Sequence, residues 1–189
     1  MYVATPEKGA GPAVIVIPEH IDAADHARRL CDRFSAEGFT AMVPVPEEGH
    51  TAADLAAAVD TLKSHPAVRG QGVGVVGFDA GAGLALWLGM HRPDDVVAVD
   101  MFSGLPPMGG GPRPDWSRLS AAIQGHFGEE DTTCPPEQVG ALEEALGEAD
   151  VAVEFFTYPT AGPGFFEEGG DAARQAWIRT LEFLRKHLG

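Results

Sequence analysis

The chain has 189 residues, of which 44% are apolar, and a formal net charge of −15 at pH 7. This length suits one domain with a full hydrophobic core, so we expect residues 1–189 to form a single domain. The acidic charge disfavours nucleic acid and anionic membranes as partners, because both require a basic surface.

The sequence also argues against membrane insertion and secretion. No apolar run approaches the ~18 residues of a membrane span. The N-terminal residues Met1 to Lys8 have neither the charged region nor the apolar region of a signal peptide. The cysteines, Cys31 and Cys134, have no metal-type spacing and form no disulfide framework, which indicates a reducing, cytoplasmic location. The Ala-, Gly-, Asp- and Arg-rich composition suits a high-GC bacterium.

Apolar runs alternate with segments of helical periodicity along the chain. In chain order we predict a strand at Ala13–Ile17, a helix at Ile21–Glu37, a strand at Thr40–Val45, a loop at Pro46–Thr51, a helix at Ala52–His65, a strand at Gly72–Val76, a helix at Leu84–Met90, a strand at Val96–Phe102, a loop at Leu105–Pro114, a strand at Ala121–Phe127, a helix at Pro135–Ala149, a strand at Val151–Tyr158, a loop at Pro159–Gly170 and a helix at Asp171–His187. Gly38 is a good C-cap for the first helix. This alternation predicts a parallel sheet with right-handed crossovers, whose reactive groups gather at the carboxyl ends of the strands.

One segment combines a strand end, a glycine-rich turn and the start of a helix. It contains Gly77-Phe78-Asp79-Ala80-Gly81, a Gly-x-x-x-Gly turn typical of a nucleophile elbow. Such a turn needs small residues on both sides, because its central residue has a strained backbone and projects its side chain at the top of a sheet. Here that residue is Asp79, where an esterase carries Ser or Cys.

Four segments together resemble the dienelactone hydrolase family, a compact branch of the α/β-hydrolase fold. They are the opening Val14–Pro44, with Glu19 after its first strand; Gly77–Ala82, where the family has Gly-Phe-Cys-x-Gly-Gly; His126–Asp131, which matches the segment ending in the triad Asp; and Tyr158–Phe165, which matches the Tyr-Pro-x-Ala-x-His-Gly-Phe segment with the triad His. The resemblance implies an α/β-hydrolase domain with a mostly parallel sheet, helices on both faces, no separate cap domain and a small-molecule substrate.

The family's site residues carry over unevenly. The resemblance places the triad acid at Asp131 and the Glu that contacts the nucleophile at Glu19, and it places the oxyanion hole at the backbone N–H groups of His20 and Ala80. The nucleophile is changed from Cys to Asp79, and the general-base His is replaced by Pro163. Because proline cannot accept a proton, the family's thiol mechanism is excluded. In the family, a polar arm after the second strand binds an anionic substrate. The resemblance places this arm at the loop Pro46–Thr51, which is shorter here.

Two kinds of catalysis remain open. Asp79 can act as a nucleophile, as in haloalkane dehalogenases of the same broad fold, and form an ester that an activated water hydrolyses. For that water His20 is the best-placed base and His126 the second, although we interpret His126 as structural. Alternatively, Asp79 and Glu19 share a pocket in which like charges raise one pKa, so that the pair works as acid and base. The substrates would be a small ester, lactone or haloacid, or a carbonyl compound converted without hydrolysis.

A different class of function is also open, because both the nucleophile and the base of the family have changed. The chain would then be a catalytically inactive relative that acts as a ligand-binding or scaffold protein. The retained glycines and the reactive residue at position 79 weigh against simple decay, since Asp is costly to bury unpaired. An open, polar pocket at Asp79 would favour the enzyme, and a pocket filled by side chains would favour the inactive protein.

The remaining candidates carry weaker signals. Phe102 and Phe165 are candidate substrate-binding residues, although aromatic residues at strand ends more often belong to the core. Cys134 is interpreted as a small loop hydrophobe and Cys31 as an inert core residue. We expect no metal and no cofactor, because no ligand spacing supports one. The expected oligomeric state is a monomer or a homodimer.

Overall fold

The computed structural model of the chain describes residues 1–19, 24–44, 52–106 and 114–189. These residues form a seven-stranded sheet with the strand order β1-β3-β2-β4-β5-β6-β7. Its strands are β1 (Tyr2–Ala4), β2 (Gly11–Ile17), β3 (Thr40–Val43), β4 (Val68–Phe78), β5 (Val96–Phe102), β6 (Ala122–Gly128) and β7 (Val153–Tyr158). Neighbouring strands run parallel except for β1, which pairs antiparallel with β3.

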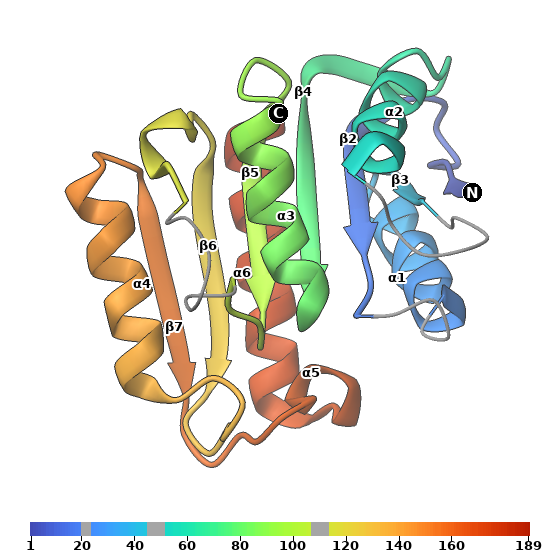
Figure 1. Cartoon of the computed structure of the whole chain (residues 1–189). Coiled ribbons are helices and arrows are strands. Elements are labelled where there is room, and N and C mark those ends of the chain that lie inside the picture. The colour runs from blue at the N-terminus through green and yellow to red at the C-terminus, as the bar shows by residue number, and fades with distance from the viewer. Residues whose placement is uncertain (20–23, 45–51, 107–113) are drawn as a thin grey trace.

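Helices cover both faces of this sheet (Figure 1). The helices are α1 (Ala24–Ala36), α2 (Ala52–Lys63), α3 (Ala80–His91), α4 (Pro136–Glu148), α5 (Phe165–Glu168) and α6 (Gly170–Leu188). Side chains of α2, α3 and α4 share one core cluster with the sheet, and those of α1, α5 and α6 share the other. The inner strands are therefore buried on both faces, which explains their continuous apolar runs. Among the described residues, none of the helices is long and apolar enough to cross a membrane.

The predicted alternation of strands and helices is confirmed, with differences at the ends of elements. Strand Val96–Phe102 has the predicted bounds, whereas β4 begins at Val68 and not at Gly72, because its first residues are exposed and carry no apolar signal. Gly38 has a positive φ of 96° after the end of α1, as a C-cap requires. Residues 21–23 of the predicted first helix lie outside the described residues.

Three short elements were not predicted: β1, α5 and the 3₁₀ helix Trp116–Arg118. Strand β1 has three residues and exists through its pairing with β3. Helix α5 lies within the segment that we predicted as the loop Pro159–Gly170. Elements this short give too few residues for a periodic pattern, so tertiary contacts decide them.

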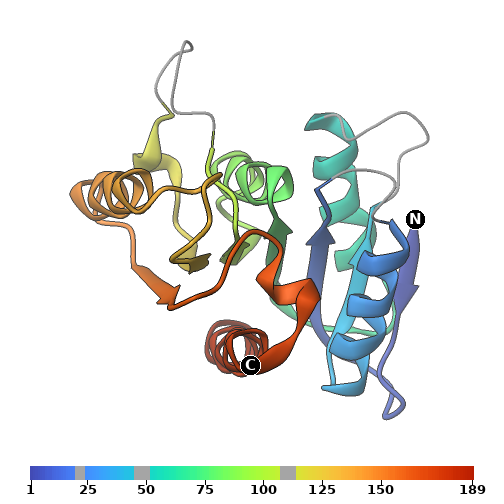
Figure 2. The same ribbon diagram turned by 90° about the horizontal axis from the view of Figure 1, so that it is seen from below.

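The six parallel strands end at the same edge of the sheet, the lower edge in Figure 1, and Figure 2 looks onto this edge. Glu19, Asp79, Ser103 and Asp131 follow the strands β2, β4, β5 and β6. The carboxyl edge thus brings together side chains that are far apart in the sequence.

Candidate active site

Asp79 lies in the sharp turn between β4 and α3. Its backbone has φ 50° and ψ −118°, a region that non-glycine residues rarely adopt. The Asp79 N–H donates to the carbonyl of Phe102 (2.8 Å), and the Asp79 carbonyl accepts from the N–H of Ala82 (3.0 Å). These bonds to β5 and α3 hold the turn in its strained conformation.

The glycines of the turn are required by close packing. A Cβ at Gly77 would overlap the backbone of Gly81 and Ala82, and a Cβ at Gly81 would overlap the carbonyl oxygen of Ile17. The turn is therefore wedged between its own helix and the end of β2, and the Gly-x-x-x-Gly pattern has a direct steric cause.

A hollow opens beside Asp79 at the carboxyl edge and encloses about 380 Å³. We call it the Asp79 hollow. Its described lining is Glu19, Asp79, Ala80, Ser103, Gly104, Leu105, Pro106, Thr133, Cys134 and Gln138. These residues come from the ends of β2, β4 and β5, from the turn after β6 and from α4. The hollow is polar and not filled by side chains, which is the arrangement that favours a ligand or a substrate.

Glu19 and Asp79 line the same hollow, and no Lys, Arg or His is among its described lining residues. Glu19 is exposed and Asp79 is half-buried. Ala80 is the first residue of α3 and also lines the hollow. The first N–H groups of a helix have no intrahelical partner and attract negative charge, so the Ala80 N–H suits a developing oxyanion.

Asp131 lies behind the hollow in the turn after β6, with only 2% of its surface exposed. Its Oδ1 accepts from the N–H of Thr133 (2.8 Å) and from the Thr133 hydroxyl (2.6 Å). Its Oδ2 is buried and has no hydrogen-bond partner among the residues that the structure describes. A buried acceptor left without a partner costs about 1–3 kcal/mol, so this oxygen calls for a ligand group or a water.

Cys134 forms a wall of the Asp79 hollow and also borders a smaller cavity of about 160 Å³. Burial, followed by the negative charge of Asp131 and, to a lesser degree, of Asp79, raises the pKa of the Cys134 thiol to about 11. The hydroxyl of Thr133 acts in the opposite direction. The thiol is therefore protonated at neutral pH and is a poor nucleophile.

The model of the dienelactone hydrolase family matches residues 1–47 and 45–188, which is nearly the whole chain. The chain belongs to the dienelactone hydrolase family. The two matched segments meet at the loop Pro46–Thr51, where we predicted a shortened arm.

Relatives and solved structures agree with this assignment. The chain is 27% identical over 225 aligned positions to the "Putative carboxymethylenebutenolidase" of Synechocystis sp., covering 99% of this chain and 91% of that protein. It is 28% identical over 218 positions to the protein usf of Aquifex pyrophilus, covering 99% and 93%. In structure it is similar to a dienelactone hydrolase-like promiscuous phosphotriesterase from metagenomic libraries, with a TM-score of 0.83 at 22% identity, covering 99% and 92%. The native esterase Est2 of Thermogutta terrifontis has a TM-score of 0.75 at 22% identity, covering 98% and 86%.

In this member of the family, the structure brings Glu19, Asp79 and Ala80 together and places Asp131 next to them through Thr133. His20 lies outside the described residues, so its side chain and its backbone N–H stay predictions. Pro163 is exposed in the loop before α5. This loop packs against the turn of Asp131, because the N–H of Glu130 donates to the carbonyl of Ala161 (2.9 Å).

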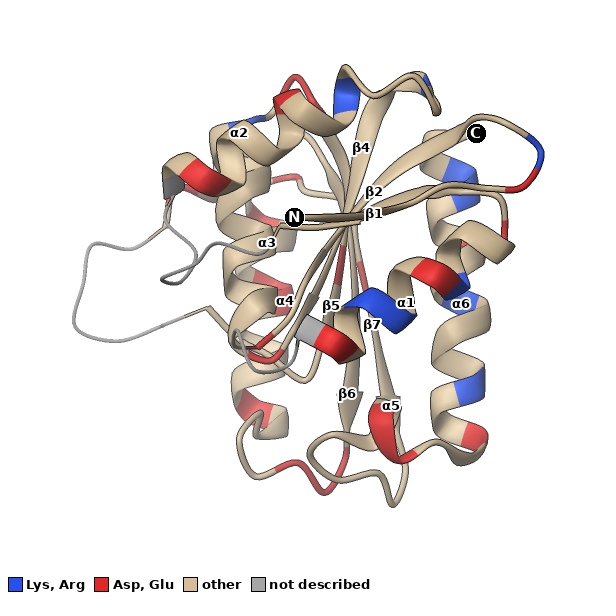
Figure 3. Cartoon of the chain, turned by 90° about the vertical axis from the view of Figure 1, so that its right-hand side faces the viewer, with Lys and Arg blue, Asp and Glu red and all other residues tan. Residues whose placement is uncertain are grey.

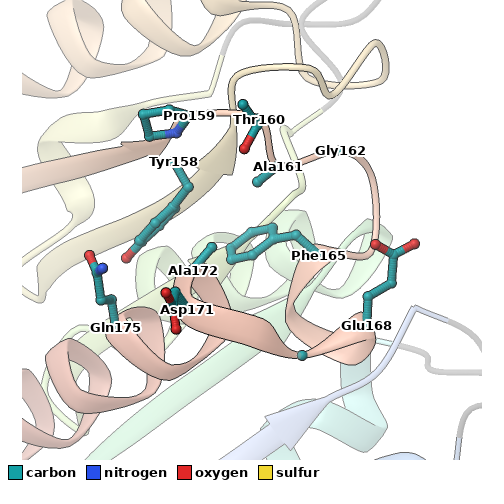
Figure 4. Close-up of a pocket in the computed structure, with 11 residues that line it drawn as sticks. Tyr158, Pro159, Thr160, Ala161, Gly162, Phe165, Glu168, Asp171, Ala172 and Gln175 are labelled. Atoms are coloured by element: carbon teal, nitrogen blue, oxygen red, sulfur yellow. The ribbon is translucent and has the colours of Figure 1, made fainter.

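Neither predicted aromatic residue lines the Asp79 hollow. Phe102 is buried in the core on the α1 and α6 face, where its ring stacks on Phe78 with 4.8 Å between centroids. Phe165 packs against Tyr158 and lines a separate pocket of about 350 Å³ (Figure 4). That pocket lies between the loop after β7 and the start of α6. Strand alternation turns Phe102 away from Asp79, and a role of either ring in substrate binding stays a prediction.

His126 is fully buried on the α6 face of the sheet. Its Nδ1 lies 2.8 Å from the hydroxyl of Tyr158, which accepts an N–H from Arg179 (3.1 Å). Gln124 Oε1 can only accept, so Nε2 carries a proton and donates it to Gln124. Nε2 lies 3.1 Å from Gln124 Oε1 and 3.2 Å from Asp100 Oδ1. The Asp100 contact is electrostatic, because its geometry does not meet that of a hydrogen bond.

Ser103 also lines the hollow and was not predicted as a site residue from the sequence. Ser103 has φ 46° and is 5% exposed, and its buried Oγ has no hydrogen-bond partner within the described part of the chain. Its N–H donates to the carbonyl of His126 (3.0 Å), and a side chain on the following Gly104 would overlap the Asp79 carbonyl. The sequence held one signal that could have identified Ser103, a polar residue directly after a buried parallel strand. A similar position after a strand identified Glu19.

His26 was also not predicted as a site residue. Its ring packs edge-on to Phe78, the residue before Asp79, and its Nε2 lies 3.6 Å from Glu167 of α5. Burial lowers the pKa of His26, and the charge of Glu167 opposes that shift. His26 does not line the Asp79 hollow, and a histidine on a predicted helix gave no signal of a site.

Proposed function

We propose that this chain is a small-molecule hydrolase that uses the carboxyl groups of Asp79 and Glu19 in place of a thiol and an imidazole, and that its substrate is a small ester or lactone. The observation that carries the proposal is the position of Asp79. It stands at the strained elbow and lines an open, polar hollow together with Glu19. A strained backbone costs of order 1–3 kcal/mol of stability and is concentrated at functional sites, so the strain at Asp79 supports a functional role.

The proposed chemistry needs one carboxylate and one carboxylic acid. Two carboxyl groups in one partly enclosed site favour a state with a single shared charge. The ionised group takes a proton from water as the water attacks the carbonyl carbon, and the protonated group gives its proton to the leaving oxygen. The N–H of Ala80, with the predicted N–H of His20, stabilises the oxyanion.

Membership of the dienelactone hydrolase family supports a small-molecule substrate, and the relative from Synechocystis is named for the hydrolysis of a lactone. Asp79 and Glu19 line the same hollow, which favours the carboxylate pair over an ester intermediate on Asp79. We therefore place the nucleophilic role of Asp79 second.

The proposal is tested by turnover of a panel of aryl esters, enol lactones and haloacids by the native protein and by Asp79→Asn. We expect the variant to lose at least about 10²-fold in kcat/KM, the usual effect of removing a general acid or base. Asp150→Asn is the matched control, because Asp150 also has a positive φ, of 57°, but is exposed after α4. Equal turnover by native protein and Asp79→Asn would refute the proposal.

The nucleophilic alternative is separated by one single-turnover reaction in H₂¹⁸O. With a haloacid as the substrate, a nucleophilic Asp79 displaces the halide and forms an alkyl ester. Water then attacks the Asp79 carbonyl carbon, so the heavy oxygen enters the Asp79 carboxylate, which mass spectrometry of the peptide detects. The carboxylate-pair mechanism leaves Asp79 unlabelled and labels only the product acid.

The inactive-relative hypothesis rests on the buried Asp131 Oδ2, which has lost the partner that a triad base would provide. It predicts no turnover of any panel member by the native protein together with specific ligand binding in the Asp79 hollow.

A further inference from the structure

The two edges of the sheet differ in how much backbone they leave unpaired. Strand β1 forms one edge with three residues, whereas β7 forms the other edge with six residues, on the far side of the sheet from the N-terminus (Figure 1). β7 pairs with β6 in a continuous register, and no strand among the described residues pairs with its other side. It contains no proline or lysine and its ladder has no bulge, the devices by which edge strands avoid other chains. β7 is therefore an edge to which another strand can add.

The hydrogen bonds to β6 identify the backbone groups that remain on this free edge. The N–H of Ile123 in β6 donates to the carbonyl of Ala152 (2.8 Å), the residue before β7. Successive residues of a strand point their N–H and C=O groups to opposite edges. The even-numbered residues of β7 therefore face β6, and Val153, Phe155 and Thr157 present their N–H and C=O groups to the free edge. Unpaired backbone groups of this kind bind an added strand.

The side chains of β7 line hollows on both faces of the sheet. Phe155 and Thr157 line the cavity of about 160 Å³ beside α4. Glu154 and Phe156 line another hollow, of about 280 Å³, beside α6. Both phenylalanines are half-buried, although they lie in a strand of the sheet. Neither helix closes over β7, so its side chains as well as its backbone can contact a partner.

The charges beside the free edge balance, whereas the chain as a whole carries a net charge of −15. The hollow beside α6 contains two acidic side chains, Glu154 and Glu182, and two basic ones, Arg179 and Lys186. The guanidinium of Arg179 lies 4.0 Å from the centroid of the Phe156 ring. A carboxylate that arrives beside Phe156 meets this cation, and Glu154 is a carboxylate on the same face of the same strand. A surface that carries both halves of an ion pair is complementary to a second copy of itself.

We propose that β7 pairs antiparallel with β7 of a second copy of this chain, around a two-fold axis at Phe155, so that the two sheets join into one. In this register Val153 lies opposite Thr157 of the second copy, and Phe155 lies opposite its own counterpart. Opposed residues of this kind exchange both of their N–H···O bonds, so the pairing uses every backbone group that β7 presents to the free edge. The interface is isologous, because each copy contributes the same strand.

The position of the axis follows from the residues around Phe155. An axis at Glu154 would place the two Glu154 side chains directly opposite each other, where like charges are destabilising. An axis at Phe156 would bring Pro159, which has no N–H, into the ladder. With the axis at Phe155, Glu154 lies opposite Phe156 of the second copy and beside the Arg179 that covers this ring. On the α4 face the two Phe155 side chains meet at the axis, as an aromatic pair.

Sedimentation velocity of the full chain tests the association, in about 0.15 M salt, because salt then screens exposed charges more than about 8 Å apart. Screening limits the repulsion between two copies of charge −15 and between their Glu143 side chains, which line the cavity beside α4. We expect the native protein to sediment with about twice the 19.9 kDa of one chain and to dissociate reversibly on dilution. A native protein that stays monomeric up to about 100 μM would overturn the proposal.

Thr157→Pro tests the backbone pairing. The N–H of Thr157 points away from β6, so proline removes a donor of the free edge and leaves the bonds to β6 in place. We expect the dimer to weaken at least about tenfold, because the lost bond occurs twice around the axis. Thr157→Val is the matched control, since it keeps the N–H and the branched side chain, and it should dimerise as the native protein does. Equal dimerisation of Thr157→Pro and the native protein would place the interface elsewhere and overturn the proposal.

Glu154→Lys tests the charge complementarity. The new cation faces Arg179 of the second copy, so we expect the dimer to weaken at least about fivefold. Glu7→Lys is the matched control, because it changes the net charge equally from an exposed position after β1, at the opposite edge of the sheet. It should leave the dissociation constant within about twofold. A tighter dimer in both variants would show that only diffuse repulsion acts and would contradict the pairing at Glu154.

Disulfide trapping tests the register. Phe155→Cys places two thiols opposite each other at the axis, with about 5.5 Å between the Cα atoms, which suits a disulfide. We expect mild oxidation to give a covalent dimer on a non-reducing gel, and none from the native protein, whose Cys31 and Cys134 are buried. Thr157→Cys is the control, because its thiols lie on opposite sides of the axis and should not join. Crosslinking through position 157 and not through position 155 would overturn the proposed register.

Discussion

Two polar regions lie near β5 and β6, one at the carboxyl edge of the sheet and the other on its α6 face. One is the Asp79 hollow. The other, which we call the His126 cluster, consists of Asp100, Gln124, His126, Tyr158, Arg179 and Thr180. α6 packs over the cluster, whose residues hold the His126 ring on several sides, whereas the hollow is open. In the part of the chain that the structure describes, buried oxygens without a hydrogen-bond partner occur in both regions, at Asp100 in the cluster and at Asp131 and Ser103 beside the hollow.

The difference shows that residue type alone does not identify a reactive site. A buried His next to an Asp has the composition of a catalytic pair, but His126 is fully buried, and its ring nitrogens lie close to Tyr158, Gln124 and Asp100. Asp79 and Ser103 have the opposite properties: a strained backbone and a place in the wall of an open hollow. Access and backbone strain, more than the presence of His and Asp, mark the candidate site.

The largest expected effect comes from rebuilding the family's chemistry in the hollow. The double variant Asp79→Cys with Pro163→His restores a thiol beside Asp131 and a base in the adjoining loop. We expect at least about 10²-fold more hydrolysis of an aryl ester than by Asp79→Cys alone, the range of one general base. If circular dichroism shows that both variants are folded and the double variant hydrolyses the ester no faster, the loop before α5 does not bring residue 163 to the hollow.

Removing the imidazole of the His126 cluster should affect stability and leave the hollow unchanged. His126→Leu removes the hydrogen bonds that the buried ring makes with the Tyr158 hydroxyl and with Gln124 Oε1, so we expect about 3 kcal/mol less free energy of unfolding in urea. His91→Leu is the control, because His91 is exposed and contacts only its own helix. Turnover of the ester and lactone panel by the folded His126→Leu protein should equal that by the native protein, and a large loss would join the two regions functionally.

Alkaline pH should weaken the native state through groups whose pKa is raised by burial. The pKa of Cys31 is raised to about 12 and that of Cys134 to about 11, from an ordinary value of 9.0. The folded state then holds these protons more tightly, so the stabilisation is complete below pH 9 and is lost as the pH rises towards 11 and 12.

Urea unfolding between pH 8 and 11 measures this loss. Cys31→Ala should show a shallower decline than the native protein, because one raised pKa has been removed. An identical decline in both proteins would assign the effect to other groups, such as Tyr158, whose pKa is also raised by burial.

The smallest expected effect is that of Ser103→Gly on stability. Loss of the strained φ and of an unpaired hydroxyl stabilises the folded state, and the greater freedom of glycine in the unfolded chain opposes this by about 0.4–1 kcal/mol. We expect the free energy of unfolding, measured in urea, to change by less than about 1 kcal/mol. A loss of more than about 2 kcal/mol would indicate that the Ser103 hydroxyl is structural.

Much of the fold and part of the site were predictable from the sequence. Continuous apolar runs fixed the six parallel strands, and glycine spacing identified the elbow at Asp79. The rule that reactive groups follow parallel strands placed Glu19, Asp79 and Asp131 at one edge. These predictions depend on local patterns, which the chain carries within a few residues.

The rest was decided by contacts between distant segments. Strand β1 exists because it pairs with β3, Phe102 turns away from the hollow because of its place in the pleat, and His126 is held by partners on β7 and α6. The unpaired oxygens of Ser103 and Asp131 can be recognised only when every neighbour is in place. Burial and hydrogen-bond satisfaction are properties of the packed structure, so no local pattern encodes them.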